Sequence, residues 1–382
     1  MPIVRTILLA YFLPVALGGQ ATQRQTPVEV VVPKAPTPVS AGGSPVLVYE
    51  LHVTNFGSRP LVLRSLEVFS GASAADRPLA MLRDSALAAV CQTVGRHSGD
   101  ERRIDPGVRA LLYVWLDVRA TGPLPPSLRQ RLTFDVVDTT AATGLVVTSV
   151  IDGLVTPVER DRVMVLAPPL VNGDWLVGDG PSNSSPHRRA LVPLNGKARI
   201  SQRFAVDLVE IGPNGNTWHD NRSRPQNFWG FGEQVHAVAS GEVVAVVDSI
   251  ADNAPDQPLP APSIPRIAGN YVIVRIGPST FFMVAHLARA SVRVKPGQHV
   301  RSGEVLGLLG NSGQTTGPHL HFQVMDAPSP LAAEGIPFVF DRFVFLGFGR
   351  DYEPTSRVEA VKRLEIPVDD AVVHFPAPSG GS

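Results

Sequence analysis

Cysteine is almost absent from this chain of 382 residues, since Cys91 is its only one. A single cysteine excludes an internal disulfide. Cys91 lies in an apolar stretch, residues 87–94, and nothing near it in the sequence suggests an activated thiolate. We therefore expect Cys91 to be a small buried side chain and not a nucleophile.

An excess of charge of either sign is also missing. The 34 basic and 34 acidic residues cancel, so composition gives no support for a nucleic-acid or other polyanionic partner. The content of 44% hydrophobic and 18% charged residues is typical of a globular protein. Because the chain is longer than one ordinary core accommodates, we expect two domains. The sequence gives no indication of the oligomeric state.

Long apolar runs are lacking, apart from a short one at the start of the chain. Arg5 is followed by apolar residues from Ile7 to Leu17, and then by small residues. The run is shorter than the roughly 20 residues that span a bilayer, and Pro14 interrupts it. We interpret residues 1–21 as a secretory signal peptide. This predicts a periplasmic or secreted protein with no membrane span after cleavage.

The first half of the chain shows the alternation of half-buried β-strands. From residue 47 to residue 54, apolar side chains occupy positions 47, 49, 51 and 53, and polar ones occupy 50, 52 and 54. Further strands are expected at residues 28–32, 61–69, 110–118, 130–137 and 145–151. About seven short strands separated by turns are typical of an immunoglobulin-like sandwich. We place this sandwich at residues 22–166 and find no cluster of reactive side chains in it.

Short strands continue in the second half, so we expect an all-β protein with a second domain at residues 167–348. The second domain begins in a loop rich in Gly, Asn and Ser at residues 171–185. Residues 252–265 are rich in proline and are expected to form an exposed loop. Residues 349–382 are expected to be a C-terminal tail.

The strongest chemical signal is the segment GPHLHFQV at residues 317–324. On a strand, His319, His321 and Gln323 project to one face, while the apolar residues between them project to the other. Another apolar strand, residues 282–287, carries His286 near its end. Two imidazoles on one face of an apolar strand indicate a catalytic or metal-binding use.

Four motifs in a fixed order give residues 190–345 a resemblance to the lysostaphin-type (M23-like) zinc metallopeptidase family. They are EQVHAVASGEV at 233–243, VAHL at 284–287, the glycine-spaced run at 294–313 and GPHLHFQV at 317–324. The resemblance implies a mainly antiparallel β domain and a zinc-dependent endopeptidase that cuts cell-wall (peptidoglycan) peptides. The alternative is a catalytically inactive domain of this type that binds the cell wall or a partner protein.

The resemblance also implies the roles of individual residues. The family holds a tetrahedral zinc with a histidine, an aspartate four residues later and the second histidine of an HxH pair, and water completes the site. Asp207 matches the aspartate, and His321 matches the last ligand. His319 and His286 match the two histidines that handle the water and stabilise the oxyanion.

One ligand of the family pattern is missing, because Arg203 stands four residues before Asp207. A guanidinium has no lone pair for a metal. Alternation predicts that residues 203, 205 and 207 share one face of a strand. We identify His187, just upstream, as the provisional third ligand, with His219 as an alternative. Two further arrangements stay open: zinc held by two protein ligands and waters, or a metal-free site in which Arg203 pairs with Asp207.

Overall fold

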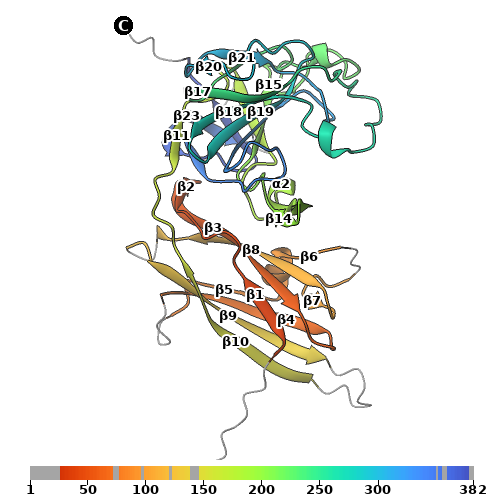
Figure 1. Cartoon of the computed structure of the whole chain (residues 1–382). Helices are drawn as coiled ribbons and strands as arrows, with labels where there is room; N and C mark the ends of the chain where they lie inside the picture. Colours follow the sequence, from red (N-terminus) through yellow and green to blue (C-terminus); the bar gives the residue numbers. More distant parts are fainter. Residues whose placement is uncertain are drawn as a thin grey trace, which may run out of the picture.

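The computed structural model describes residues 26–71, 77–95, 99–119, 123–137, 146–349, 352–354 and 359–377. The predicted signal peptide at residues 1–21 lies outside the described residues. Figure 1 shows two β-rich bodies, the first coloured red to yellow and the second green to blue. Within the described ranges, no helix combines the length and the apolar character needed to cross a membrane.

Two antiparallel sheets form the first body. One has the order β1-β3-β8-β6, with β2 beside β3, and the other has the order β10-β9-β4-β5, with β7 beside β4. If β1, β3, β4, β5, β6, β8, β9 and β10 are named A, B, C, C′, D, E, F and G, the two sheets have the immunoglobulin orders A-B-E-D and G-F-C-C′. The expected immunoglobulin-like sandwich is therefore confirmed. The strands are β1 (Val28–Val31), β2 (Val39–Ala41), β3 (Ser44–Asn55), β4 (Leu61–Ser70), β5 (Ala80–Arg83), β6 (Cys91–Thr93), β7 (Arg103–Ile104), β8 (Arg109–Asp117), β9 (Ser127–Val137) and β10 (Val146–Pro157). A short helix, α1 (Asp84–Ala89), leads into β6, where Cys91 is buried as expected.

Strand β3 is buried on both faces, although its sequence alternates. Leu47 and Tyr49 lie in the core between the two sheets of the sandwich. Val46 and Val48, on the other face, pack into the core of the second body. Burying a valine side chain contributes roughly 1.5–3 kcal/mol. The first body therefore supplies part of the hydrophobic core of the second.

The second body is built on an eleven-stranded sheet with the order β11-β23-β25-β12-β15-β22-β19-β18-β17-β20, and β24 lies beside β23. Neighbouring strands are antiparallel except β11 and β23, so the expected mainly antiparallel fold is confirmed. The strands are β11 (Met164–Leu166), β12 (Asp174–Gly178), β15 (Val206–Ile211), β17 (Gly241–Val247), β18 (Asn270–Gly277), β19 (Thr280–Leu287), β20 (His299–Val300), β22 (Leu320–Met325), β23 (Phe338–Phe348), β24 (Ala360–Glu365) and β25 (Ala371–His374). Two hairpins, β13 (Val192–Leu194) with β14 (Lys197–Arg199) and β16 (Gln234–His236) with β21 (Val305–Leu308), and a short helix, α2 (Pro186–Arg189), complete it.

Two segments differ from the sequence-based expectation. The expected tail contains β24 and β25, and β25 lies between β23 and β12 inside the sheet. The expected loop at residues 171–185 contains β12. This strand has only five residues, of which Trp175 and Val177 are buried. The exact division of the chain into domains stays a prediction, but residues 360–374 belong to the second sheet.

The centre of this sheet and α2 position the candidate site. Strands β15, β22 and β19 are neighbours, so side chains on one face of each strand meet. Figure 1 shows α2 and β14 at the end of the second body that faces the sandwich. The candidate site residues on these elements therefore lie near the junction of the two bodies.

Candidate metal and catalytic site

Asp207 and His321 are brought together by strand register. Asp207 on β15 lies directly opposite His321 on β22, and side chains of directly opposed residues project to the same face. The Nδ1 atom of His321 is 2.9 Å from Oδ1 of Asp207. His321 is 2% exposed and Asp207 is 9% exposed. Both side chains are therefore buried, and only groups in direct contact with them can complete their hydrogen bonds.

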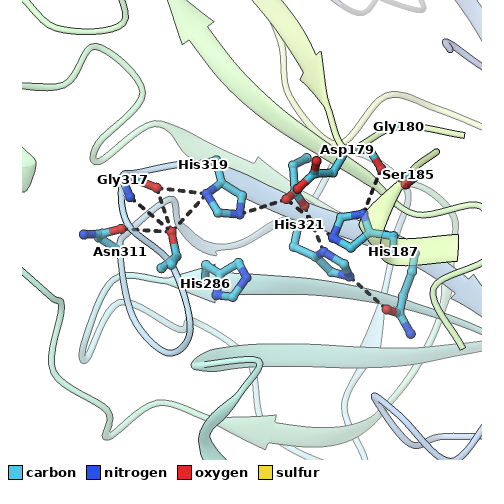
Figure 2. A network of polar contacts seen from close by, with 12 residues as sticks. Asp179, Gly180, Ser185, His187, His286, Asn311, Gly317, His319 and His321 are labelled. Carbon is cyan, nitrogen blue, oxygen red and sulfur yellow. Dashed lines mark hydrogen bonds and ion pairs between the residues drawn. The ribbon is translucent and has the colours of Figure 1, made fainter. Parts of the chain in front are cut away.

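His187 reaches the same point from the short helix α2, upstream of β15. Its Nε2 atom is 3.5 Å from Oδ2 of Asp207. Its ring meets that of His321 edge-on, with 4.8 Å between centroids. Ligand atoms of His187, Asp207 and His321 all lie within 4.8 Å of one another. Figure 2 shows the two imidazoles converging from different elements.

The protons of both imidazoles are assigned by their other hydrogen bonds. Nδ1–H of His187 donates to the backbone carbonyl of Asp179 at 3.0 Å, which leaves the lone pair of Nε2 facing Asp207. Nε2–H of His321 donates to Oε1 of Gln323 at 2.8 Å, which leaves the lone pair of Nδ1 facing Asp207. A carbonyl or amide acceptor behind a metal-binding histidine sets its tautomer in this way. Two imidazole nitrogens and a carboxylate fit a zinc ion.

Gln323, for which we predicted no role from the sequence, contacts the outer nitrogen of His321. Its side-chain Nε2 donates to the carbonyl of Pro330 at 3.2 Å, so Oε1 is turned toward His321. The period of two that places Gln323 on the face of His319 and His321 is the signal that could have identified it.

Arg203 does not pair with Asp207 but with two glutamates, so the alternative in which Arg203 forms an ion pair with Asp207 is wrong. Residues 201–204 form a turn, and β15 begins only at Val206. Arg203 therefore does not share a strand face with Asp207. It is 3% exposed, and its guanidinium contacts Glu50 and Glu334, each at 2.8 Å.

His219 lies outside the cluster. The histidine is exposed on its loop, and its ring packs against Trp229 with 5.0 Å between centroids. Its Nε2 atom is 3.3 Å from the carbonyl of Gln226. Within the described ranges, His187 is the histidine that joins Asp207 and His321 in a group able to hold a metal ion.

His319 and His286 lie beside this group (Figure 2). The Nε2 atom of His319 is 3.3 Å from Oδ2 of Asp207, and its Nδ1 atom is 2.9 Å from the carbonyl of Gly317. Nδ1–H of His286 donates to the carbonyl of Ser312 at 2.8 Å. The rings of His286 and His319 are 4.8 Å apart between centroids. Both predicted non-ligand histidines are therefore next to the candidate metal ligands.

The backbone of His286 is held in an uncommon conformation. Its φ is +62°, in the left-handed region that non-glycine residues seldom adopt. The register between β18 and β19 shifts at this point, next to Asn270. Such a conformation persists only where the surrounding structure enforces it, and it is frequent at active sites.

Burial and neighbouring charges shift the pKa values of the site residues in different directions. Burial raises the pKa of Asp207, but His319 and His187 outweigh this effect and hold the pKa well below its usual range. Burial lowers the pKa of His187 to about 4, against the attraction of Asp207. Burial, followed by the neighbouring histidines His319 and His321, lowers the pKa of His286 to about 3. For His319, burial acts downward, but Asp207 raises the pKa overall.

A cavity of about 300 Å³ opens onto these side chains. Besides the four histidines and Asp207, its lining includes Gln202, Met283, Gln314 and Leu331. A larger cavity of about 550 Å³ lies at one end of the sandwich, but Arg59 is the one ionisable side chain in its lining. Because convergent polar groups mark a reactive site better than volume does, the smaller cavity is the candidate site.

Comparison with known proteins supports the resemblance to M23 peptidases for part of the chain. Residues 228–333 match the sequence pattern of Peptidase family M23. The "Peptidoglycan DD-endopeptidase ShyA" of Vibrio cholerae serotype O1 is 41% identical over 66 residues, which are 17% of this chain and 15% of that protein. An "Uncharacterized metalloprotease" of Haemophilus influenzae is 33% identical over 138 residues, or 35% of this chain and 24% of the relative. The chain thus matches about a quarter or less of the length of these relatives.

Among solved structures, the chain is similar to the catalytic domain of the antimicrobial peptidase lysostaphin from Staphylococcus simulans. The two are 20% identical, with a TM-score of 0.24, and the similarity covers 43% of this chain and 88% of that one.

Proposed function

We propose that this chain is a zinc-dependent endopeptidase that cuts cell-wall (peptidoglycan) peptides outside the cytoplasm, because residues 228–333 match the sequence pattern of Peptidase family M23. One observation carries the proposal: ligand atoms of His187, Asp207 and His321 lie within 4.8 Å of one another. The peptidoglycan substrate is supported by the name of the relative ShyA. The extracytoplasmic location is supported by that substrate and by the signal-like sequence at residues 1–21.

The metal would be held by Nε2 of His187, a carboxylate oxygen of Asp207 and Nδ1 of His321. Three protein ligands are the usual number in a catalytic zinc site, which keeps a further position for water or substrate. When bound, zinc supplies Lewis-acid polarisation of a peptide carbonyl and lowers the pKa of water. The depressed pKa of Asp207 keeps its carboxylate ionised, and the lowered pKa of His187 keeps its Nε2 lone pair free at neutral pH.

The two neighbouring histidines would divide the handling of the proton. Because Nδ1–H of His286 is used by Ser312, its Nε2 atom is left as an acceptor that orients a water molecule. A pKa of about 3 makes His286 a weak base. His319, whose pKa is raised, is better suited to take up the proton and pass it to the leaving amine. In its protonated form it would also stabilise the developing oxyanion.

The proposal is tested by incubating the purified protein with purified peptidoglycan and separating the products by mass spectrometry. New amino ends at the cross-links are expected with zinc present, and they should disappear with a chelator and return with added zinc. His319→Ala should lower the rate about 10²- to 10⁴-fold, as expected for a lost acid–base group.

His219→Ala is the matched control for these measurements. This histidine is exposed and lies outside the cluster, so its substitution should leave the products and the rate unchanged. Cleavage that persists after complete removal of metal would contradict the proposal. Binding to peptidoglycan without cleavage by the zinc-loaded protein would instead support a catalytically inactive wall-binding domain.

A further inference from the structure

A second buried polar cluster lies beside the candidate metal ligands and joins the two bodies of the molecule. Glu50, on β3 of the sandwich, is 2% exposed. Its Oε1 atom accepts a hydrogen bond from Nε of Arg188 and its Oε2 atom accepts one from Nε of Arg203, both at 2.8 Å. Arg203 also pairs with Glu334 at 2.8 Å. Two arginines and two glutamates make this cluster electrically neutral.

Arg188 is fixed mainly by the sandwich. The residue is fully buried, and its Nη2 atom donates to the backbone carbonyls of Tyr49 at 2.9 Å and Val114 at 3.0 Å. Its Nη1 atom donates to Asn183 in the second body. With Glu50, three of its four hydrogen-bond acceptors therefore belong to strands β3 and β8. A guanidinium presents its N–H groups in a rigid fork, so these contacts define its orientation.

Helix α2 has little capacity to hold its own position. It has only four residues, far fewer than the roughly 12–15 that an isolated helix needs to be marginally stable. His187 immediately precedes Arg188 on this helix. The hydrogen bond from His187 to the carbonyl of Asp179 sets its tautomer, whereas Arg188 fixes the backbone that carries the ring.

The other oxygen of Glu50 acts on the segment that leads to Asp207. Arg203 lies in the turn at residues 201–204, directly before β15. Besides Glu50, its guanidinium donates to the carbonyl of Gly335 at 2.9 Å. One carboxylate of the sandwich thus contacts residues next to two of the three proposed ligands, Arg188 beside His187 and Arg203 in the turn before Asp207.

We propose that Glu50 and Arg188 are positioning residues of the metal site, and that the sandwich domain completes this site by holding His187 in place. The inference rests on the proposed metal binding by His187, Asp207 and His321. It explains the departure from the family pattern at Arg203 together with the unusual ligand: Arg203 belongs to the Glu50 cluster, and His187 is positioned by that cluster.

Joining the two bodies does not by itself require buried charges. Val46 and Val48 already pack into the core of the second body, and the guanidinium of Arg189 lies over the ring of Tyr113 at 5.1 Å. Apolar side chains in place of a buried ion pair are often equally stabilising. What Glu50 adds, with one hydrogen bond to each carboxylate oxygen, is a defined geometry for α2.

The test compares metal affinity in the full chain and in Arg188→Met, Arg188→Lys and Glu50→Gln. The zinc dissociation constant is measured by competition with a chromophoric chelator, and the ligand geometry by the absorption spectrum of the Co²⁺-substituted protein. Loss of a residue that orients a metal ligand typically lowers affinity about 10- to 100-fold. We expect this loss and an altered Co²⁺ spectrum in Arg188→Met, and a smaller loss in Arg188→Lys, which keeps the charge but not the fork.

Arg129→Met is the matched control, because Arg129 is a nearly buried arginine paired with Asp152 within the sandwich, away from α2. It should lower stability while leaving metal affinity and the Co²⁺ spectrum unchanged. If Arg188→Met does not fold, Arg188→Lys decides. Wild-type affinity and spectrum in the folded Arg188 variants would overturn this inference alone. A wild-type chain that binds no metal would overturn the proposed function and this inference with it.

Discussion

His187 and Arg188 follow one another on α2, but their side chains enter two buried clusters of different character. The guanidinium of Arg188 donates to a carboxylate, an amide and two carbonyls, so each of its three nitrogen atoms has an acceptor within the protein. In the cluster of His187, acceptor atoms face each other: Nδ1 of His321 and Oδ1 of Asp207 are 2.9 Å apart. A proton or a cation must lie between two such acceptors.

The difference shows how a structural ion pair and a ligand site can be distinguished within one protein. Buried polar groups are normally hydrogen-bonded within the protein, and those of the Glu50 cluster are. In the Asp207 cluster, the outer atoms of the imidazoles are satisfied by Asp179 and Gln323, while the inner atoms converge. Satisfied outer atoms and converging inner lone pairs indicate a metal site. Three substitutions test this contrast, and a fourth tests a buried carboxyl group outside both clusters.

The largest effect is expected from Asp207→Asn, which removes the only charge among the proposed ligands. A catalytic metal contributes several kcal/mol to transition-state stabilisation, so kcat/KM should fall about 10³-fold or more. Zinc content should fall with it. Asp179→Asn is the control, because Asp179 contributes its backbone carbonyl to His187 and not its carboxylate. Retention of both zinc and activity in Asp207→Asn would remove Asp207 from the site.

Glu50→Gln is the matching change in the structural cluster. It leaves Arg188 without its buried carboxylate, and loss of one partner of a buried pair costs about 3–5 kcal/mol of unfolding free energy. Urea denaturation measures this change. Glu29→Gln is the control, because Glu29 is half exposed and lies 4.0 Å from Arg109, where a pair contributes about 0–1 kcal/mol. Equal stabilities of the two variants would show that the Glu50 cluster is not a tightly coupled one.

A third change acts on only one of the two nitrogen atoms of His321. Gln323→Met removes the acceptor of Nε2–H of His321 while leaving all three proposed ligands in place. Zinc affinity should fall about 10- to 100-fold, because the tautomer is no longer imposed. Gln314→Met is the control, since Gln314 lines the same cavity while the outer imidazole atoms bond to Asp179 and Gln323 instead. Equal affinities, measured by chelator competition, would show that Gln323 does not set the tautomer.

The smallest effect concerns Glu210, which is on β15 but outside both clusters. Burial, followed by repulsion from Glu233 and Asp174, raises its pKa to about 7, and its Oε2 atom has no hydrogen-bond partner among the described residues. Between the ordinary pKa of a glutamate and about pH 7, the folded protein therefore holds a proton on Glu210 that the unfolded chain has lost. The free energy of unfolding falls as the pH rises through this range. Glu210→Gln should remove that slope. Its melting temperature should exceed that of wild type more at about pH 8 than at about pH 5, and a constant difference would contradict this assignment.

Much of the fold follows from local sequence patterns. The alternation in residues 47–54 predicts β3, and the spacing of turns predicts the sandwich. Strands β12 and β25 are not predicted because each is very short, with five and four residues, and obtains its stability from neighbours that are distant in sequence. Local alternation also cannot show that β3 is buried on both faces, since Arg188 and Arg203, the partners of its polar residue Glu50, come from the second body.

The site is predictable where its residues share a strand and not where they meet through tertiary structure. His319, His321 and Gln323 follow from a period of two. His187 is a candidate only because it precedes Asp207 closely in the chain. The role of Arg203 cannot be predicted, because its partner Glu50 is 153 positions away and no local pattern connects them.

The ligand role of His187 is tested most directly by the zinc content of the purified protein in three forms: wild type, His187→Ala and His219→Ala. If His187 completes the site that Arg203 cannot, wild type and His219→Ala will each contain one equivalent of zinc, and His187→Ala will contain little or none. A full equivalent of zinc in His187→Ala, bound as tightly as in wild type, would contradict the central claim.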